Sequence, residues 1–255
     1  MMNEMSRKTR LIQYLLRTGM FERREEAALA IMRSRITVDG RIITNPNFEI
    51  REKSAVCLDG KQVFKVRDIY LAINKPEGVL CQKSRKNSDR TVFSIIKEKI
   101  PSMSEYELNS LFSVGRLDKD TTGLLIVTND GRLNELMMKP DRKVEKTYIA
   151  RLDRAISEDA IRKLRAGVFI PVEGEVGKKS EHKTKGCSAE RIKSNEVRIT
   201  IHEGKKRQVR LMFEAVGFRV VALKRVSIGG ISLKRLGIEK DGDMKEINKE
   251  QAYSF

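Results

Sequence analysis

One polar loop stands out as the segment best suited to carry chemistry. Residues 114–131, VGRLDKDTTGLLIVTNDG, place this loop between two apolar stretches, and Gly115 and Gly123 lie on either side of Asp118. Glycine allows backbone angles and close approaches that other residues resist, while the hydroxyl of Thr121 can fix the loop by local hydrogen bonds. A carboxylate held in this way at the end of a strand is a candidate nucleophile or general base.

The same residues have a simpler structural interpretation. An Asp in a turn bounded by glycines often caps a backbone amide, and residue types alone favour that role for Asp118. The residue types therefore define a candidate site, but they do not identify a reaction.

The charge of the chain indicates which partner such a loop would face. Lys and Arg total 52 against 35 Asp and Glu, which gives a formal net charge of +17. Each phosphate that is neutralised by Lys or Arg releases condensed counterions, so this excess favours a nucleic acid. Charge alone does not exclude a merely soluble basic protein, and a DNA-binding protein has no other feature in its support.

Several functional classes find no support in the sequence. The chain has no apolar run long enough to span a membrane, so no membrane partner is expected. His182 and His202 are too few and too scattered for a metal site. No dinucleotide-binding motif is present, so we expect neither a metal nor another cofactor. Cys57, Cys81 and Cys187 are far apart and form no CxxC pair, which favours a reducing, cytoplasmic location.

The elements that must position the loop divide into two groups, of which the first is small. Residues 7–18 and 21–32 have apolar side chains at helical spacing. Asp39-Gly40, between two short β-branched runs, is a strong hairpin signal. Residues 1–66 are therefore expected to form a compact α/β domain.

From residue 67 to residue 255, strand-like and helix-like stretches alternate. Residues 69–73 form an apolar strand, and residues 197–201 alternate apolar and polar side chains as a half-buried strand does. Residues 207–216 have the spacing of an amphipathic helix that ends at Gly217. The expected fold class is α+β, with a mixed, mainly antiparallel sheet and flanking helices in this second domain.

The first domain resembles a known RNA-binding module. The segment FERREEAALAIMRSRITVDGRII, residues 21–43, resembles the S4 RNA-binding domain, in which two helices and the adjoining loop present Arg and Lys to RNA phosphates. The resemblance implies RNA contacts for a group of basic residues, namely Arg7, Lys8, Arg10, Arg23, Arg24, Arg33 and Arg35. For any single one of them a solvated helix surface explains the residue equally well, and it is the cluster that favours RNA.

The loop around Asp118 belongs to a longer match. GRLDKDTTGLLIVTNDG, residues 115–131, resembles the signature of pseudouridine synthases of the ribosomal small-subunit family, which commonly carry an N-terminal S4 domain. Further blocks of the family pattern follow in order, at Asn74–Val79, Glu145–Tyr148 and Glu203–Arg210. The Asp of Gly-Arg-Leu-Asp is catalytic in that family, so the resemblance implies this role for Asp118 and not for Asp120 or Asp130.

The resemblance also implies roles for neighbouring side chains. Tyr148 would stack on an extruded uracil and assist proton transfer. Arg210 would pair with Asp118, keep its carboxylate ionised and orient it, and Arg116 would lie beside the reacting nucleotide. Each residue also has a simpler alternative. Tyr148 would be half-buried packing, Arg210 a phosphate contact, and Arg116 part of a structural salt bridge.

Further residues are expected to bind the substrate around this centre. Lys75 and Thr121 would line the cleft, and Leu223 would lie in an apolar strand that walls the active site in this family. Three adjacent basic residues would contact RNA phosphates, namely Lys205, Lys206 and Arg207. Leu211 stands where the family usually has a further Arg, a departure that concerns substrate choice more than reaction type.

The activity implied by the resemblance is the isomerisation of a specific uridine to pseudouridine in structured RNA. The reaction involves no redox change and no group donor, so it needs no cofactor. Ribosomal RNA is the expected substrate, with the large subunit slightly preferred and transfer RNA as the alternative, and the chain is expected to act as a monomer. The competing hypothesis is a non-catalytic S4-type RNA-binding or ribosome-assembly factor, which gives no reason for Gly-Arg-Leu-Asp, Tyr148 and Arg210 to occur in one chain.

Overall fold

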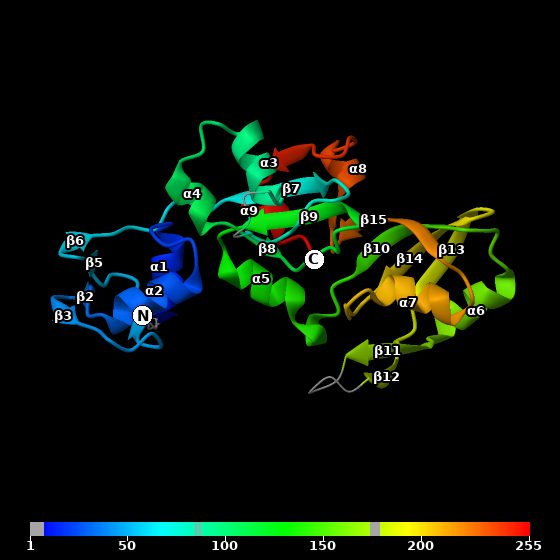
Figure 1. Ribbon diagram of the computed structural model, residues 1–255, viewed down its shortest axis with the longest axis horizontal. Coiled ribbons are helices and arrows are strands. Elements are labelled where there is room, and N and C mark those ends of the chain that lie inside the picture. The colour runs from blue at the N-terminus through cyan, green and yellow to red at the C-terminus, as the bar shows by residue number, and fades with distance from the viewer. Residues whose placement is uncertain (1–7, 85, 87, 174–178) are drawn as a thin grey trace, which may run out of the picture. The chain divides into compact units, whose positions relative to one another are not determined.

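The computed structural model describes residues 8–84, 86, 88–173 and 179–255. The chain forms two compact units, and many of their helices and strands are labelled in Figure 1. The first comprises the chain up to Ile69 together with Phe93–Phe112 and Thr128–Gly131. The second comprises Tyr70–Val92, Ser113–Val127 and Arg132–Phe255.

Up to residue 69, the described chain contains two helices and six short strands. The helices are α1 (Leu11–Arg17) and α2 (Arg24–Met32). The strands form a sheet of order β3-β2-β5-β6 and a separate pair, β1-β4. Their bounds are β1 Thr9–Arg10, β2 Ile36–Val38, β3 Arg41–Ile42, β4 Glu49–Ile50, β5 Val56–Leu58 and β6 Lys61–Gln62. Two later helices, α3 (Val92–Lys99) and α4 (Glu105–Ser110), belong almost entirely to the same unit.

Local sequence explains how these elements begin and turn. The Glu26 carboxylate accepts a hydrogen bond from the backbone N–H of Arg23 across 3.3 Å, which satisfies a free donor where α2 starts. Asp39 and Gly40 have φ angles of 51° and 80°, the left-handed values that a tight hairpin turn requires. The hairpin predicted at Asp39-Gly40 is confirmed, because Val38 pairs with Arg41 on the opposite strand.

A cluster of buried apolar side chains joins the two helices to the small sheet. Leu11, Leu15, Ala27 and Ile31 are fully buried, and they pack with side chains such as Ile36 from the strands. Burying one apolar face of each element in a shared core is what allows so small a unit to fold.

The second unit is built on a sheet of nine strands within the described residues. Seven strands follow the order β13-β14-β10-β15-β9-β7-β17, while β16 pairs with β15 and β8 pairs with β9. Their bounds are β7 Tyr70–Lys75, β8 Phe112–Val114, β9 Thr122–Thr128, β10 Lys146–Leu152, β13 Ser188–Lys193, β14 Glu196–Ile201, β15 Val220–Ile228, β16 Ile231–Ser232 and β17 Met244–Glu246. β9 and β15 run parallel, whereas β10 is antiparallel to both of its neighbours. The predicted mixed, mainly antiparallel sheet with flanking helices is confirmed.

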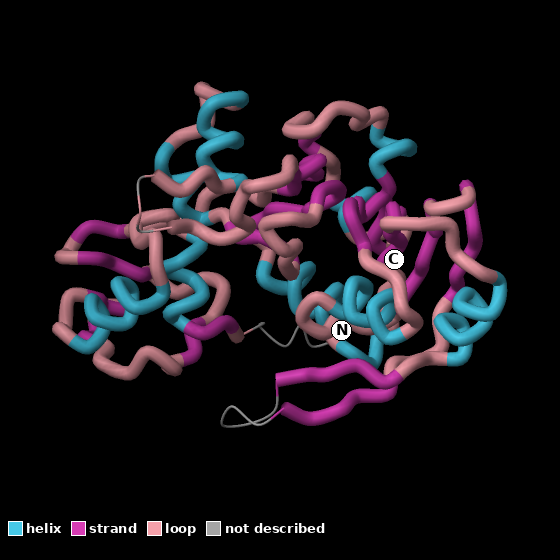
Figure 2. Tube along the Cα trace, turned by 45° about the vertical axis from the view of Figure 1, so that its right-hand side comes forward, coloured by secondary structure: helices cyan, strands magenta, loops and turns pink. Residues whose placement is uncertain are grey.

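Helices and one hairpin complete the second unit. They are α5 (Gly131–Met138), the 3₁₀ turn η1 (Pro140–Arg142), α6 (Glu158–Ala166), β11 (Phe169–Glu173), β12 (Lys179–Lys183), α7 (Gln208–Ala215), α8 (Leu233–Leu236) and α9 (Lys249–Ala252). β11 and β12 pair only with each other and extend beyond the main sheet as a two-stranded ribbon (Figure 2). Among the described residues, no helix has both the length and the apolar character that a membrane span requires.

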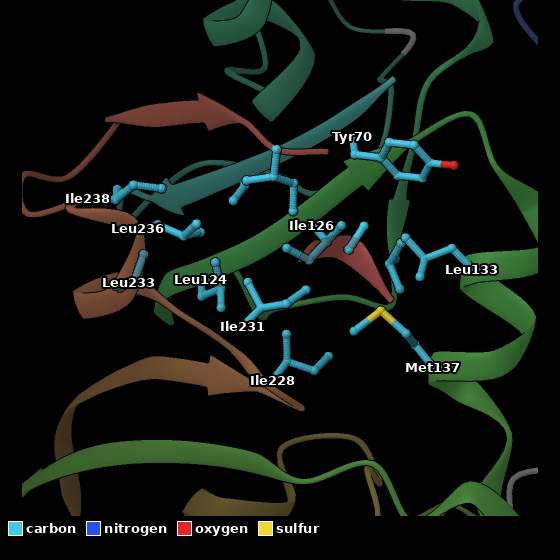
Figure 3. Close-up of a cluster of buried hydrophobic side chains, with 14 of the residues drawn as sticks. Tyr70, Leu124, Ile126, Leu133, Met137, Ile228, Ile231, Leu233, Leu236 and Ile238 are labelled. Atoms are coloured by element: carbon cyan, nitrogen blue, oxygen red, sulfur yellow. The ribbon is translucent and has the colours of Figure 1, made fainter. Parts of the chain in front are cut away.

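The core of the second unit fixes the strand that follows the Asp118 loop. Leu124 and Ile126 of β9 are fully buried and pack with Leu133 and Met137 of α5 and with Ile228 of β15 (Figure 3). Because β9 begins at Thr122, directly after the loop, this packing holds the end of the loop in place.

Candidate active site

Asp118 lies in the loop that connects β8 to β9. The backbone carbonyl of Asp118 accepts a hydrogen bond from the N–H of Thr121 across 3.0 Å, which closes a tight turn. The Asp118 side chain is half-buried, and no residue in the described part of the chain forms a hydrogen bond or ion pair with its carboxylate. The turn that residue types favoured is thus present, but it uses the backbone of Asp118 and leaves the carboxylate free.

The loop that follows β7 supports the turn from one side. The N–H of Gly78 donates to the carbonyl oxygen of Lys119 across 2.8 Å. The sulfur of Cys81 lies 3.3 Å from both the backbone nitrogen and the carbonyl oxygen of Leu117, the residue before Asp118. Two segments that are close to forty residues apart in sequence therefore hold each other through backbone atoms.

Lys75 lies beneath this arrangement, with none of its surface exposed. Its ammonium donates hydrogen bonds to the carbonyl oxygens of Pro76 and Val79, each across 2.9 Å, and to that of Lys119 across 3.4 Å. Burial lowers the pKa of Lys75 below its usual value. The residue was expected to line the cleft; the structure instead places its ammonium where it joins the two loops.

Asp120 anchors the same turn to α7. Arg207 donates through Nη1 to Oδ1 of Asp120 across 3.3 Å and through Nη2 to Oδ2 across 3.2 Å. Nη2 of Arg210 lies 3.3 Å from Oδ2 and donates to the backbone carbonyl of Asp120 across 2.8 Å. Burial alone would raise the pKa of Asp120, but the hydrogen bond from Arg207 and the positive charges of both arginines outweigh it, so the pKa lies below its usual value of 3.8.

The pairing of Arg210 with Asp118 is not found among the described residues. Nη1 of Arg210 donates to the carbonyl oxygen of Val220 across 3.0 Å, and Nη2 is taken by Asp120. Its Nε is buried and has no hydrogen-bond partner among the residues that the structure describes. The expectation named Asp118 as the partner of Arg210, whereas in the structure the guanidinium of Arg210 contacts the carboxylate and the backbone carbonyl of Asp120, two residues further along the turn.

Tyr148 lies in the middle of the sheet. In β10 it is opposite Arg225 of β15 and Ile199 of β14, and its side chain is only 8% exposed. Its hydroxyl makes no hydrogen bond within the described residues. Arg225 is also buried; its Nε donates to the carbonyl oxygen of Leu124 across 2.8 Å, while its Nη2 has no hydrogen-bond partner in the described chain.

Leu223 is placed beside the end of the loop by a parallel strand pair. Lys224 and Arg225 of β15 are in register with Thr122 and Gly123 of β9. The hydroxyl of Thr122 donates to the carbonyl oxygen of Leu223 across 3.4 Å. Leu223 itself is buried, as expected of a residue in a central strand.

The remaining expected substrate contacts differ in exposure. Arg116 is exposed and forms no hydrogen bond or ion pair with any described residue. Thr121 is buried, and its hydroxyl has no hydrogen-bond partner in the part of the chain that the structure describes. Lys205 and Lys206 are exposed at the loop that leads into α7.

A cleft of about 710 Å³ opens beside this site within the second unit. It is lined by acidic, basic and apolar side chains from several segments: Glu77, Asp120, Asp153, Arg207, Arg210, Glu214, Phe218, Arg219, Val220 and Val221, together with Gly217. Asp120 and both of its arginine partners face the cleft, whereas Asp118 and Tyr148 are not among its lining residues. In the described part of the chain, no cluster of three or more His, Cys, Asp or Glu side chains could hold a metal ion.

Comparison with family models decides the family. Residues 69–215, which carry the Asp118 loop, Tyr148 and Arg210, match the model of RNA pseudouridylate synthase, and residues 9–63 match that of the S4 domain. The chain belongs to the RNA pseudouridylate synthase family. It is therefore an RNA pseudouridine synthase with an S4 RNA-binding domain ahead of its catalytic domain.

Relatives extend the likeness over almost the whole synthase. Ribosomal large subunit pseudouridine synthase B of Bacillus subtilis is 30% identical over 243 residues, which are 95% of this chain and 93% of the relative. Ribosomal small subunit pseudouridine synthase A of Salmonella typhimurium is 36% identical over 208 residues, 81% of this chain and 84% of the relative. A crystal structure of a pseudouridylate synthase superposes with a TM-score of 0.63 at 26% identity, covering 91% of this chain and 93% of that one.

The S4 domain of the synthase presents most of its expected RNA contacts to solvent. Lys8, Arg10, Arg24, Arg33 and Arg35 are exposed, and Arg23 is half-buried. Two of them have acidic partners: Lys8 lies 3.8 Å from Glu49, and Nε of Arg35 donates to Asp59 across 3.0 Å. Arg7 lies outside the described residues.

Sequence reasoning missed a polar cluster that organises the start of α7 in the synthase. Glu203 accepts hydrogen bonds from the N–H of Lys185 across 2.9 Å and from the side-chain amide of Gln208 across 2.7 Å, and lies 3.1 Å from Nε2 of His182. The amide oxygen of Gln208 in turn accepts from the N–H of Lys205 across 2.9 Å. The signal was present in the block Glu203–Arg210, where an acid and an amide flank the basic residues.

Proposed function

We propose that this enzyme isomerises a uridine of ribosomal RNA, and that Asp118 is its catalytic residue. The observation that carries the assignment is the state of the Asp118 carboxylate. It has no partner among the described residues, although its turn is held by Lys75, Gly78 and Cys81. A reactive group must be held in position, because positioning supplies much of an enzyme's rate enhancement. It must also be free of hydrogen bonds and ion pairs to other residues, so that it can act on the substrate.

The reaction asks little of the protein beyond positioning and proton transfer. The bond between N1 of uracil and C1′ of ribose breaks, the base turns, and C5 of uracil bonds to C1′. The proton lost from C5 is balanced by one gained at N1, so no electrons are exchanged with another molecule. Asp118 would act on the ribose or on the base, as nucleophile or as general base.

Three other side chains complete the proposed centre. Tyr148 would stack on the uracil and use its unpartnered hydroxyl in proton transfer. Leu223 would form an apolar wall, since it is adjacent to the end of the loop through Thr122. Arg116, which is exposed and unpaired in the described structure, would contact the reacting nucleotide.

The basic surface would supply the energy that base extrusion requires. Removing a base from its stack costs a few kcal/mol, and phosphate contacts offset that cost through counterion release. We propose that Lys205, Lys206 and the exposed basic residues of the S4 domain, residues 1–66, make these contacts. The catalytic domain would then span residues 67–255.

The choice of ribosomal RNA rests on the relatives, and the large subunit is slightly preferred. The Bacillus subtilis relative, named for the large subunit, aligns with 95% of this chain, whereas the Salmonella relative, named for the small subunit, aligns with 81%. A cytoplasmic enzyme that acts as a monomer fits this assignment, because one chain carries both the RNA-binding domain and the proposed centre.

The test uses Asp118→Asn and transcripts of both ribosomal RNAs that are labelled with tritium at uracil C5. Wild-type enzyme should release tritium from one of them, and the variant should be slower by about 10²- to 10⁴-fold with unchanged RNA affinity. Sequencing that maps pseudouridine in each transcript identifies the target. A wild-type rate for Asp118→Asn would refute the catalytic role of Asp118. Modification of transfer RNA alone would refute the proposal that ribosomal RNA is the substrate.

A further inference from the structure

The four-stranded sheet of the S4 domain has two faces of different character. Ile36, Val38 and Val56 are buried in the core that the sheet shares with α1 and α2. Figure 1 shows the four strands to the left of both helices. Side chains alternate along a strand, so the residues that lie between or beside these three point away from the helices.

A row of four side chains, the outer row, crosses the side of the sheet that points away from the helices. Thr37 of β2 pairs with Ile42 of β3 on one side and with Cys57 of β5 on the other. Cys57 in turn pairs with Gln62 of β6. Because neighbouring strands are about 4.8 Å apart, the row is about 14 Å long. Its members are uncharged, and the side chains of Thr37, Cys57 and Gln62 make no hydrogen bond with any described residue.

Phe64 extends the outer row at the β6 edge, and together they make up the outer face. The preceding residue, Val63, is buried; its N–H donates to the carbonyl oxygen of Val56 across 2.9 Å, and its carbonyl oxygen accepts from the hydroxyl of Tyr14 across 3.0 Å. By alternation Phe64 points outward, where it is 68% exposed, and Ile42 at the opposite edge is 63% exposed. The ring is therefore presented to solvent from a fixed backbone, which keeps the entropic cost of a contact small.

Two cations flank this uncharged surface. Arg41 precedes Ile42 and Lys61 precedes Gln62; both are exposed, and neither forms a side-chain hydrogen bond or ion pair with any described residue. Single-stranded RNA is the complement of such a surface, because its bases stack on aromatic rings while its phosphates pair with cations. A second copy of this chain fits less well, since it would bring the same cations together in a molecule whose formal net charge is +17.

We propose that the outer face binds single-stranded nucleotides of the RNA that the enzyme modifies, with one base stacked on Phe64 and phosphates paired with Arg41 and Lys61. Thr37 and Gln62 supply hydrogen-bonding groups for the edges of the bases. The exposed arginines of α2 lie across the core from this face, so the domain holds RNA through two separate surfaces. The inference rests on the proposed function for the choice of RNA, but it does not depend on the role of Asp118.

The first experiment places a fluorescent reporter on the outer face. The chain contains no tryptophan, so Phe64→Trp gives a protein with a single indole. The probes are a single-stranded RNA of about 12 nucleotides and the same sequence in a duplex. The single strand should quench the emission, because a base stacks on the indole, and the duplex should not, because its bases are already stacked. Tyr106→Trp is the control: Tyr106 is 53% exposed on α4, which contacts α1, and its emission should not change. Equal quenching of both variants, or quenching by the duplex alone, contradicts the inference.

The second experiment measures affinity for the same single strand. Phe64→Ala should weaken binding by about 5- to 150-fold without changing the slope of log affinity against log salt, because stacking releases no counterions. Phe64→Tyr should bind as wild type does, and Arg41→Gln should reduce the slope by about 0.7.

Two results would overturn the inference: wild-type affinity for Phe64→Ala, or a change in the emission of Phe64→Trp when its own concentration rises without RNA, which would indicate a second copy on this face. Tritium release separates this inference from the proposed function. If wild-type enzyme modifies a ribosomal RNA transcript while Phe64→Ala binds normally, only this inference fails. If wild-type enzyme modifies neither transcript, the proposed substrate fails, whatever the oligonucleotide shows.

Discussion

Gly123 of β9 and Arg225 of β15 approach so closely that a Cβ built on Gly123 would lie 2.2 Å from the carbonyl oxygen of Arg225 and 2.6 Å from its amide nitrogen. The φ of Gly123 is +106°, which side chains of L-residues rarely allow. The parallel pairing of β9 with β15, which places Leu223 beside the Asp118 loop, therefore requires a residue without a Cβ atom at position 123.

Gly123→Ala is expected to destabilise the folded protein by about 2–4 kcal/mol, because it combines backbone strain with a steric clash. Chemical denaturation followed by circular dichroism measures the change. Gly131→Ala is the control: a Cβ at Gly131 would contact no other group of the described residues, so the stability of this variant should stay within about 0.5 kcal/mol of wild type or rise. Equal stability of the two variants would contradict the prediction.

Tyr148→Phe is expected to separate the two proposed roles of the tyrosine. The ring remains and the unpartnered hydroxyl is lost, so the single-turnover rate should fall by about 10²-fold while RNA affinity is unchanged. Tyr148→Leu should also lose base stacking, which is worth about 1–3 kcal/mol per base. If Tyr148→Phe releases tritium as fast as wild type, the hydroxyl takes no part in the reaction.

Glu203 is expected to make part of the stability dependent on pH. Burial would raise its pKa, but the hydrogen bonds from the Lys185 N–H, from His182 and from Gln208 outweigh burial, so the pKa lies below its usual value of 4.5. A carboxyl whose pKa falls on folding contributes stability above its unfolded pKa, and that contribution is lost as the pH drops through the folded value. Glu203→Gln should therefore be less stable than wild type near neutral pH.

The measurement for Glu203 is urea denaturation of wild type and variant at several pH values from about 7 to 3. The gap between the two unfolding free energies should shrink once the pH falls below about 4.5. Glu181→Gln, an exposed change on β12, should follow wild type throughout. A gap that is the same at every pH would show that the charge of Glu203 is not what stabilises the start of α7.

The arginines of the S4 domain are expected to contribute unequally to RNA binding. Arg24 and Arg33 are exposed and have no acidic partner among the described residues, whereas Arg35 is paired with Asp59. Arg24→Ala or Arg33→Ala should reduce the slope of log affinity against log salt by about 0.7–0.9 each. Arg35→Ala should change it less, because Asp59 already neutralises that charge. RNA-binding titrations between about 50 and 200 mM salt measure the slope for each variant. Equal slopes for Arg24→Ala, Arg33→Ala and Arg35→Ala would contradict the prediction.

Local sequence patterns predicted helices, strands and turns, but they could not predict contacts between segments that are far apart in the sequence. The turn at Asp39-Gly40 requires only two adjacent residues with left-handed backbone angles, and Gln208–Ala215 is amphipathic within its own length. The turn and the helix can therefore both be predicted from their own residues. The contact of Cys81 with Leu117 joins residues 36 apart, and nothing in either neighbourhood indicates it.

The candidate site was likewise predictable in part. Family resemblance located the Asp118 loop, Tyr148 and Arg210, but it could not determine that Arg210 would meet Asp120. That choice depends on how α7 docks on the turn, a tertiary relationship that a linear pattern does not contain. Lys75 illustrates the same limit: its block was recognised, yet its complete burial follows from the closing of two loops over its ammonium.

The parallel pairing of β9 with β15 also sets when a newly made molecule becomes competent. Thr122 and Leu223, which its hydroxyl contacts, are 101 residues apart in the chain. At synthesis rates of about 5–20 residues per second, roughly 5–20 s separate their emergence from the ribosome. Contacts of such long sequence separation also form slowly. A nascent chain therefore exposes its basic N-terminal segment several seconds before the neighbourhood of Asp118 can assemble.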